Sequence, residues 1–349
     1  MKAVRFYGKE DIRIEDIAEP SPGAGQAKLC NAFTGICGTD LHVFFNPDVS
    51  GFDFSKPNEL TGATLPQVFG HEFSGTVVEV GEGVTGHVEG DRVAVWPLHH
   101  CGKCPACVNG LYNGCQKLAC QGVSSPGGGM SEYTLVEADK LFTLPDPVDL
   151  RMGALVEPMA TAWHAVARSG VKPGQTALIV GAGPIGIGLW FALKARGVDR
   201  IVVSEPIEHR RSLIADVGAE IVVDATPDGL AAAVAAATGG RGVDVAFEAA
   251  GVGVAVTQAI ANLTPQGVLV IVALHEKEFA FNPTQFVFAE NTIVGSIAYL
   301  AEDFRAVIEA MSEGRYTTEG WISTVQFEGL VDAFAELRAG QGMKVLVQS

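Results

Sequence analysis

The sequence predicts an α/β protein with a doubly wound parallel sheet in one domain and a mostly antiparallel β-structure in a second. Three observations carry this prediction. Strand-like and helix-like runs alternate from Thr176 to Leu274, alternating β patterns dominate the first 150 residues, and the chain has 349 residues. Continuous apolar strands separated by helices are typical of a parallel sheet covered on both faces. At roughly 100–200 residues per domain, the length favours two domains.

The first 150 residues are expected to form antiparallel strands joined by long loops. The stretches KAVRFY, QAKLCNAF and FSGTVVEVG alternate in polarity, lie among many Gly and Pro turns, and include no helix-period segment of any length. A helix is expected next, near residues 158–169, because Pro158 suits a first helical turn and Gly170 suits the end. This helix could bridge the two domains.

The parallel sheet is expected to use five apolar runs as strands: TALIV, IVVSE, EIVVD, VDVAFE and VLVIVAL. The helices between them are PIGIGLWFALKARG, HRRSLIADVG, the Ala-rich LAAAVAAATGG and VAVTQAIANL. After about residue 290, TIVGSIAYL is strand-like, whereas DFRAVIEAMSEG and FEGLVDAFAELRAG are helical. The closing MKVLVQS is predicted to be a strand that returns the chain to the first domain.

Charge argues against nucleic acid and anionic membranes as partners. Lys plus Arg is 24 and Asp plus Glu is 40, which gives a net charge of −16. The uncharged stretch from Pro173 to Leu193 is broken by prolines and glycines, so it is interpreted as buried strand, turn and helix rather than a membrane span. The N-terminus is charged from Lys2 onward and lacks the apolar run of a signal peptide. A cytoplasmic location is therefore expected.

A glycine-rich turn after the strand TALIV predicts a dinucleotide-binding site. Gly181 permits the tight turn, Gly183 lets a pyrophosphate approach the backbone, and Gly186 allows close helix packing. The helix N-terminus stabilises the phosphate charge. The motif is completed by Pro184 and Ile185.

Cofactor preference is expected to depend on Glu205, which ends the next strand 24 residues after Gly181. Its carboxylate would accept hydrogen bonds from the adenosine ribose and repel a 2′-phosphate, which favours NAD over NADP. Arg210 and Arg211 are close enough to weaken that preference, although both could simply lie on a solvated helix face. The alternative to the whole assignment is a structural glycine turn beside a solvated Glu.

Four cysteines within 15 residues predict a structural zinc site. Their thiolates complete a tetrahedral shell with no position left for substrate. A redox pair or two disulfides are the alternatives, against which a cytosolic compartment argues. Cys30 and Cys120 fall outside the spacing, and His99 and His100 are interpreted as neighbouring loop residues. The four proposed ligands are Cys101, Cys104, Cys107 and Cys115.

A second, mixed set of residues could hold a catalytic metal. One sulfur, one nitrogen and one or two carboxylate oxygens leave a coordination position open for substrate oxygen. The candidates are Cys37, His71, Glu72 and Glu157. Each alone could equally be a buried cysteine, a core histidine or a surface glutamate. Thr39 and His42 would place a hydroxyl and a proton-transferring imidazole beside the metal. No partner is identifiable from the sequence for His87, His164, His209 and His275.

Together these motifs resemble the zinc-dependent medium-chain dehydrogenase/reductase family. The resemblance spans the chain through GICGTDLH, GHEFSG, the four-cysteine lobe, LVEP, GAGPIG and the closing KVLV. Within the family, the chain is most similar to the 2,3-butanediol dehydrogenases. This similarity lies in the opening MKAVRFYGKEDIRIEDI, the long segment from Val43 to Val68, and SEP after the second strand of the parallel sheet. The sequence QKLACQGVSSPGGGMSEY after the lobe departs from the pattern and leaves the local loop shape open.

The resemblance implies a GroES-like catalytic domain formed by residues 1–158 and 298–349 and a Rossmann NAD-binding domain formed by residues 159–297. It implies one catalytic zinc on Cys37, His71 and Glu157, with Glu72 as a ligand or an exchanging neighbour. Thr39 and His42 would form the proton relay, and the lobe cysteines would hold one structural zinc.

The implied reaction is reversible hydride transfer between NAD(H) and a small secondary alcohol or ketone. The expected substrates are the diol 2,3-butanediol and the hydroxyketone acetoin. The resemblance also implies reaction at the carbinol carbon of R configuration. Zinc would act as a Lewis acid on the substrate oxygen. Sorbitol and L-threonine 3-dehydrogenases share nearly every motif and remain alternatives. A catalytically silent NAD-binding relative would be expected to lose the metal ligands, all of which are present here. Relatives are commonly dimers or tetramers, so a homo-oligomer is expected.

Overall fold

The computed structural model describes all 349 residues and divides into two compact units. The first unit contains Met1–Glu157, Leu300–Gly314 and Ile322–Ser349. The second contains Pro158–Tyr299 and Arg315–Trp321. The assignment of a catalytic role to residues 1–158 with 298–349, and of an NAD-binding role to residues 159–297, stays a prediction.

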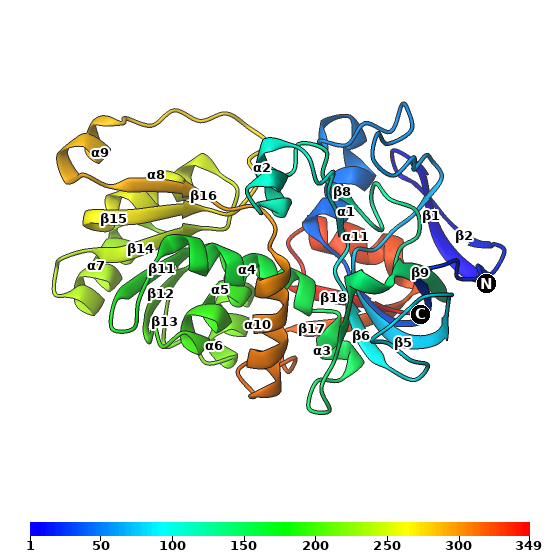
Figure 1. The fold of residues 1–349 in the computed structure, drawn as a ribbon. Helices are drawn as coiled ribbons and strands as arrows, with labels where there is room; N and C mark the ends of the chain where they lie inside the picture. The colour runs from blue at the N-terminus through cyan, green and yellow to red at the C-terminus, as the bar shows by residue number, and fades with distance from the viewer. The chain divides into compact units, whose positions relative to one another are not determined.

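The first unit is built mainly from antiparallel strands (Figure 1). A three-stranded sheet has the order β2-β1-β4, and a larger sheet has the order β10-β6-β5-β3-β18-β17, with β9 also paired to β3. β7 and β8 form a separate pair. The strands are β1 (Lys2–Gly8), β2 (Asp11–Asp16), β3 (Gln26–Gly35), β4 (Gln67–Val68), β5 (Glu72–Val80), β6 (Arg92–Val95), β7 (Leu98–His99), β8 (Ala119–Cys120), β9 (Tyr133–Glu137), β10 (Leu141–Thr143), β17 (Ile322–Gln326) and β18 (Lys344–Gln348).

Helices of this unit are short, apart from the two near the C-terminus. They are α1 (Gly38–Phe45), α2 (Pro105–Val108), α3 (Leu150–Gly153), α10 (Ala301–Ser312) and α11 (Leu330–Arg338), with 3-10 turns η1 (Pro47–Val49), η2 (Tyr112–Gly114), η3 (Ala138–Lys140) and η4 (Phe327–Gly329). The two-turn helix α1 lies where the sequence showed no helical period, because its eight residues are too few to establish one.

The C-terminal strand β18 returns to the N-terminal sheet, as predicted. It pairs antiparallel with β3, with Leu346 opposite Gly35. On the other side of β3, Gly35 lies opposite Glu72 in β5. β3 therefore lies between β18 and β5, and the side chains of Lys344 at the start of β18 and Glu72 at the start of β5 meet over Gly35.

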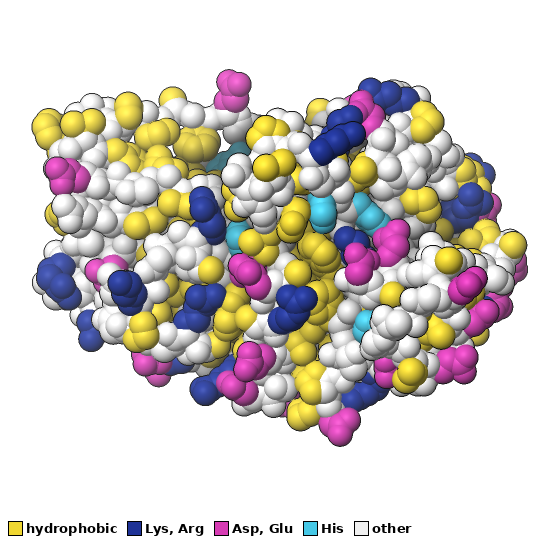
Figure 2. Space-filling view, in the orientation of Figure 1, with side chains coloured by type: hydrophobic (Ala, Val, Ile, Leu, Met, Phe, Trp, Pro, Cys, Tyr) yellow, Lys and Arg dark blue, Asp and Glu magenta, His cyan; other side chains and the backbone are white.

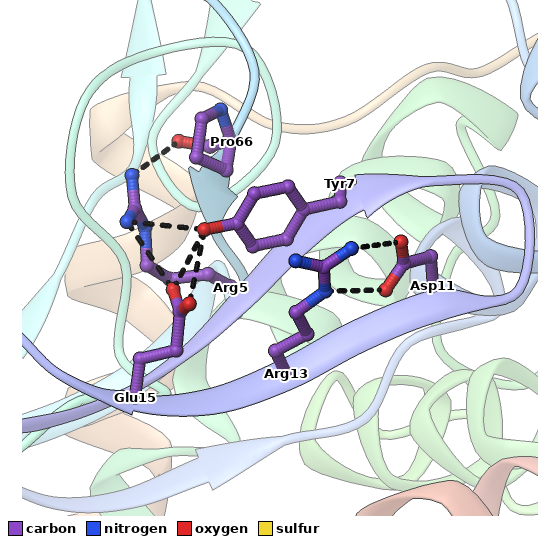
Figure 3. A network of polar contacts seen from close by, with 6 residues as sticks. All are labelled: Arg5, Tyr7, Asp11, Arg13, Glu15 and Pro66. Atoms are coloured by element: carbon purple, nitrogen blue, oxygen red, sulfur yellow. Dashed lines mark hydrogen bonds and ion pairs between the residues drawn. The ribbon is translucent and has the colours of Figure 1, made fainter.

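A polar network on the β1–β2 hairpin fixes the end of the long loop that leads to β4 (Figure 3). Tyr7 Oη donates a hydrogen bond of 2.9 Å to Glu15, and Arg5 donates one of 3.2 Å to the same carboxylate. Arg5 also donates to the carbonyl oxygen of Pro66 at 3.5 Å. The Arg13 guanidinium lies 4.1 Å from the centre of the Tyr7 ring. The end of the segment from Val43 to Val68 is therefore held against β1.

The second unit contains the predicted doubly wound parallel sheet, with strand order β13-β12-β11-β14-β15-β16 (Figure 1). Its strands are β11 (Thr176–Val180), β12 (Arg200–Ser204), β13 (Ile221–Val223), β14 (Val243–Glu248), β15 (Leu263–Ile271) and β16 (Thr292–Gly295). Its helices are α4 (Val156–Ser169, which begins two residues before the unit), α5 (Pro184–Ala195), α6 (Glu208–Asp216), α7 (Pro227–Thr238), α8 (Gly253–Ala261) and α9 (Thr284–Ala289).

Both faces of this sheet are covered by helices. Leu230 of α7 and Ala259 of α8 share one buried cluster with Leu178 of β11. On the opposite face, α5 approaches the end of β11 so closely that a Cβ at Gly186 would lie 2.0 Å from the carbonyl oxygen of Gly181. The strand order changes direction between β11 and β14, which is the switch point where open α/β sheets bind ligands.

Candidate metal and cofactor sites

The four lobe cysteines form a sulfur cluster of the size that zinc requires. Sγ atoms are 3.5 Å apart for Cys104 and Cys107, 3.6 Å for Cys101 and Cys115, and 4.0 Å for Cys101 and Cys107. With Zn–S bonds of about 2.3 Å, a tetrahedral site has sulfur–sulfur edges of about 3.8 Å. All four cysteines are free thiols, so the disulfide alternative is wrong for this structure.

Backbone N–H groups around the lobe are directed at the sulfurs. Cys101 N donates to Cys115 Sγ at 3.3 Å, Cys104 N donates to Cys101 Sγ at 3.4 Å, and Lys117 N donates to Cys115 Sγ at 3.4 Å. Such donors stabilise thiolates, which are the form that binds metal. The lobe therefore fits a structural zinc ion with no open position.

We expect the Cys104→Ser variant to retain one zinc ion fewer per chain than the parent and to unfold at a temperature about 5–10 °C lower. At a closed four-cysteine site the metal-binding free energy is folding free energy. Metal analysis of the purified protein, together with calorimetry, checks both effects. Cys30→Ser, outside the lobe, is the control and should keep the parent's zinc content. Equal zinc content in the parent and Cys104→Ser would contradict the assignment.

A second cluster joins Cys37, His71 and Glu72. Their ligand atoms all lie within 4.8 Å of one another. Cys37 is the N-cap of α1, whereas His71 and Glu72 stand at the start of β5, so adjacent pairing of β3 and β5 brings them together. Glu157, in the first turn of α4, is buried but lies outside this three-residue cluster.

Asp40 orients two of these candidate ligands. Its Oδ2 accepts a hydrogen bond of 2.9 Å from Cys37 N, and its Oδ1 lies 3.3 Å from His71 Nδ1. A carboxylate against one imidazole nitrogen leaves Nε2 for a metal and is the usual support of metal-binding histidines. Burial opposes the charged imidazolium, but the Asp40 carboxylate and Cys37 outweigh it and raise the pKa of His71.

Lys344 lies against Glu72, and both side chains are fully buried, at 2% and 1% exposure. Lys344 Nζ forms an ion pair with Glu72 Oε2 and donates a hydrogen bond of 2.9 Å to the carbonyl oxygen of Ile36. A Cβ on Gly35 would collide with this ion pair. Burial alone would lower the pKa of Lys344, but the facing Glu72 carboxylate and Cys37 raise it.

The chemistry of this donor set fits a divalent cation. Asp40, Glu72 and the Cys37 thiol are buried or half-buried acidic groups around His71, and Lys344 supplies one positive charge. Acidic groups buried together are costly unless cations neutralise them. One sulfur, one nitrogen and one oxygen donor are also the types that catalytic zinc uses.

The predicted relay residues share one face of α1. Thr39 Oγ1 lies 3.7 Å from Cys37 Sγ, and His42 follows Thr39 by three residues, close to one helical turn. Both side chains are half-buried. A hydroxyl beside a candidate metal ligand, with an imidazole one turn further along, is the arrangement that the predicted proton relay requires.

The glycine motif has the geometry of a dinucleotide-binding turn. Gly181 has a φ of +102°, which favours glycine, and a Cβ there would lie 3.0 Å from the carbonyl carbon of Ala249. Gly183 is the N-cap of α5, with Pro184 and Ile185 in the first turn, and a Cβ at Gly183 would meet nothing within 4 Å. Open space at a helix N-terminus suits a pyrophosphate.

Glu205 is bonded to the glycine motif itself. Its Oε2 accepts a hydrogen bond of 2.8 Å from Ala182 N, and its Oε1 accepts one of 2.9 Å from Ile207 N. Each carboxylate oxygen keeps a second lone pair, so a ribose hydroxyl can still donate to it. Arg211 is directed to backbone carbonyls and Asp224, whereas Arg210 Nε is buried without a hydrogen-bond partner.

Comparison with known proteins identifies the family. Residues 23–146 match the alcohol dehydrogenase GroES-like domain, and residues 184–313 match the zinc-binding dehydrogenase family. The (R,R)-butanediol dehydrogenase of Bacillus subtilis is 42% identical over 323 residues, which cover 91% of this chain and 90% of the relative. The chain belongs to the zinc-dependent medium-chain dehydrogenase/reductase family.

Solved structures agree with this family and with the predicted fold class. The crystal structure of 2R,3R-butanediol dehydrogenase from B. subtilis has a TM-score of 0.91 and 40% identity, covering 100% of this chain and 99% of that one. An alcohol dehydrogenase from Escherichia coli CFT073, complexed with NADH, has a TM-score of 0.88 and 27% identity, with coverage of 100% and 99%. The family assignment makes this dehydrogenase a zinc enzyme with a nicotinamide cofactor.

Several polar contacts in the structure were not predicted from the sequence. Asp40 follows Cys37 by three residues, an N-cap spacing that could have revealed it. Lys344 is a lysine inside an otherwise apolar strand, a weaker signal. Two of the four histidines for which the sequence indicated no partner have carboxylate neighbours: His87 Nδ1 lies 3.6 Å from Asp91, and His275 Nε2 lies 2.9 Å from Glu248.

The segment after the lobe forms a turn that is tied to its surroundings. Ser125 Oγ lies 3.3 Å from His99 Nε2, and His99 Nδ1 lies 3.5 Å from Glu137. His99 belongs to β7 rather than to a loop. Burial raises the pKa of Cys120 to about 12, so this thiol stays protonated at neutral pH.

No helix of the structure has the length and apolar character required to cross a membrane.

Proposed function

We propose that this dehydrogenase transfers hydride between NAD(H) and a small secondary alcohol, with (R,R)-2,3-butanediol and acetoin as the preferred pair. The observation that carries the proposal is the three-residue cluster of Cys37, His71 and Glu72, in a chain 42% identical to a butanediol dehydrogenase. Three protein ligands leave a fourth position for a substrate oxygen.

Each predicted site residue has one role in this proposal. Cys37 and His71 hold zinc, Asp40 fixes His71, and Glu72 or Glu157 supplies the remaining oxygen. Bound zinc supplies Lewis-acid polarisation of the substrate oxygen, and NAD accepts the hydride. Thr39 takes the alcohol proton and passes it to His42, which releases it to solvent. Residues 1–158 with 298–349 form the catalytic domain, and residues 159–297 bind NAD.

Preference for a vicinal diol requires a polar group for the second hydroxyl. The carboxylate of Glu72 or Glu157 that does not bind zinc can accept that hydrogen bond. A site built for such a bond rejects an alcohol without the second hydroxyl, because its buried acceptor is then left unpaired.

Initial rates with NAD on a substrate panel test the proposal. The panel contains the separated 2,3-butanediol stereoisomers, 2-butanol, sorbitol and L-threonine. We expect the highest kcat/KM for the R,R isomer and a value at least about 100-fold lower for 2-butanol. A higher kcat/KM for sorbitol or threonine would assign the chain to those dehydrogenases. No reaction with any member would favour the catalytically silent alternative.

We expect a strong preference for NAD over NADP, because Glu205 would place a carboxylate against the 2′-phosphate. Glu205→Ser should raise the KM for NAD by about tenfold and reduce the NAD/NADP ratio of kcat/KM. Glu205→Gln is the matched variant, which keeps an acceptor but removes the charge, and should change the ratio more than the KM for NAD. Equal kcat/KM with both cofactors in the parent would show that Glu205 does not face the ribose.

We also propose a homo-oligomer formed through the edge of the parallel sheet. β16 is the last strand of that sheet, and no side chain of the neighbouring helix α9 is fully buried, although Phe286 packs against the core of the unit. Val287, Phe288 and Ile293 are 73%, 87% and 45% exposed, and Figure 2 shows hydrophobic side chains gathered over this part of the unit. Exposed apolar edges of this kind associate with other chains.

A cytoplasmic location is proposed as well, supported by seven free cysteines.

Sedimentation equilibrium tests the oligomer. We expect the parent to sediment as a dimer or tetramer and Ile293→Lys to shift toward monomer, because a charge on the edge strand opposes pairing. Val88→Lys, an exposed apolar position in the other unit, is the control. A monomeric parent would contradict the proposal.

A further inference from the structure

A buried histidine–carboxylate pair lies at the carboxyl edge of the parallel sheet. Glu248 is the last residue of β14 and is 0% exposed. His275 follows β15, and its Nε2 lies 2.9 Å from Glu248 Oε2. The other carboxylate oxygen accepts hydrogen bonds of 2.8 Å from Ala250 N and 2.7 Å from Gly251 N. Glu248 therefore joins the loop after β14 to the segment after β15.

The segment after β15 packs directly on the loop after β14. A Cβ at Gly251 would lie 2.9 Å from the carbonyl oxygen of Leu274. Phe279 lies with its ring centre 5.2 Å from that of His275, and a Cβ at Gly253 would lie 2.5 Å from Phe279 Cβ. These glycines leave no space between the two segments. The contact between His275 and Glu248 adds a polar link between the same two segments.

The same loop also contacts the glycine motif. Ala249 N donates a hydrogen bond of 2.9 Å to the carbonyl oxygen of Val180, and Ala249 lies against Gly181. β11 and β14 flank the switch point where a dinucleotide binds in such a sheet. The chain of contacts therefore runs from His275 through Glu248 and Ala249 to the first glycine of the phosphate-binding turn.

We propose that His275 is a positioning residue for the dinucleotide, acting through Glu248 to fix the two loops that line the cofactor crevice at the switch point. The inference rests on the proposed function, because it requires a nicotinamide dinucleotide in this crevice. His275 Nδ1 is buried and has no hydrogen-bond partner. With Nε2 donating to Glu248, Nδ1 is an acceptor, so an N–H or O–H donor of the bound dinucleotide could satisfy it.

Three variants test the inference. His275→Phe keeps a ring of similar size but cannot donate to Glu248. His275→Gln keeps a side-chain N–H donor. His87→Phe is the matched control, because His87 lies 3.6 Å from Asp91 in the other unit. The readouts are the Kd of NADH by fluorescence titration, the KM for NAD, kcat, and the thermal midpoint.

We expect His275→Phe to raise the Kd of NADH and the KM for NAD about tenfold while kcat changes less than about threefold, because the pair acts on cofactor binding and not on the alcohol. His275→Gln should restore the Kd to within about threefold of the parent, and His87→Phe should bind NADH like the parent. If His275→Phe fails to fold, His275→Gln and Glu248→Gln carry the test, with Glu248→Gln expected to weaken NADH binding more than His275→Gln.

Three results would overturn the inference. A parent that binds NADH, with His275→Phe or Glu248→Gln binding it equally tightly, would refute the positioning role and leave the proposed function intact. A parent that binds no NADH would refute both. A lower thermal midpoint with an unchanged Kd would show that the pair is structural only.

Discussion

Replacing Cys37 by Ser is expected to lower kcat/KM for the alcohol at least about 1,000-fold while the chain stays folded. The Cys37 thiol is one of three donors within 4.8 Å in the open cluster. Losing the metal removes Lewis-acid stabilisation of several kcal/mol, and about 4 kcal/mol corresponds to 1,000-fold. The fold should survive because Cys37 is the N-cap of α1 and Ser is a favourable N-cap residue.

Steady-state rates, zinc content and circular dichroism of Cys37→Ser check this expectation. The variant should lose the catalytic zinc and keep the lobe zinc. Cys30→Ser is the control, because Cys30 is a half-buried thiol on β3 outside both clusters. Full activity in Cys37→Ser would show that Cys37 is not a ligand of the catalytic metal. Loss of secondary structure would make its role structural.

Replacing Lys344 by Met is expected to lower the free energy of unfolding by about 3–5 kcal/mol, because it leaves a buried carboxylate without its cation. Glu72 is 1% exposed, so water cannot take the place of Lys344. The methionine side chain fills a similar volume, which separates the loss of charge from the loss of packing. Urea unfolding of the zinc-loaded protein measures the change.

Two controls identify the cause. Combining Lys344→Met with Glu72→Gln removes both charges and should recover part of the lost stability. Lys2→Met breaks an exposed ion pair with Glu328 and should cost less than about 1 kcal/mol. A loss below about 1 kcal/mol for Lys344→Met would show that the Glu72 carboxylate has another neutralising partner.

Features whose residues are close in sequence could be predicted without the structure. The glycine turn after β11 and the four-cysteine lobe each lie within one short segment, so spacing alone defines their geometry. The alternation of apolar strands and helices likewise predicted the parallel sheet, because each element has its own local pattern. Strand ends were less predictable: of TIVGSIAYL, only Thr292–Gly295 is strand.

Features that depend on distant pairing could not be predicted. Lys344 is 272 residues from Glu72, and the two meet only because β18 and β5 both pair with β3. No local pattern encodes that meeting. His275 and Glu248 meet across two parallel strands for the same reason. Contacts set by sheet order require knowledge of the tertiary fold.

Isotope transfer shows directly whether hydride passes from the diol to the nicotinamide ring. Zinc-loaded protein is incubated with NAD and (R,R)-2,3-butanediol that carries deuterium on both carbinol carbons. We expect acetoin and NADH that carries one deuterium on the nicotinamide ring, with a lower rate than for unlabelled diol, and no product with Cys37→Ser. NADH without deuterium, or equal product formation by Cys37→Ser, would contradict direct hydride transfer at the cluster of Cys37, His71 and Glu72.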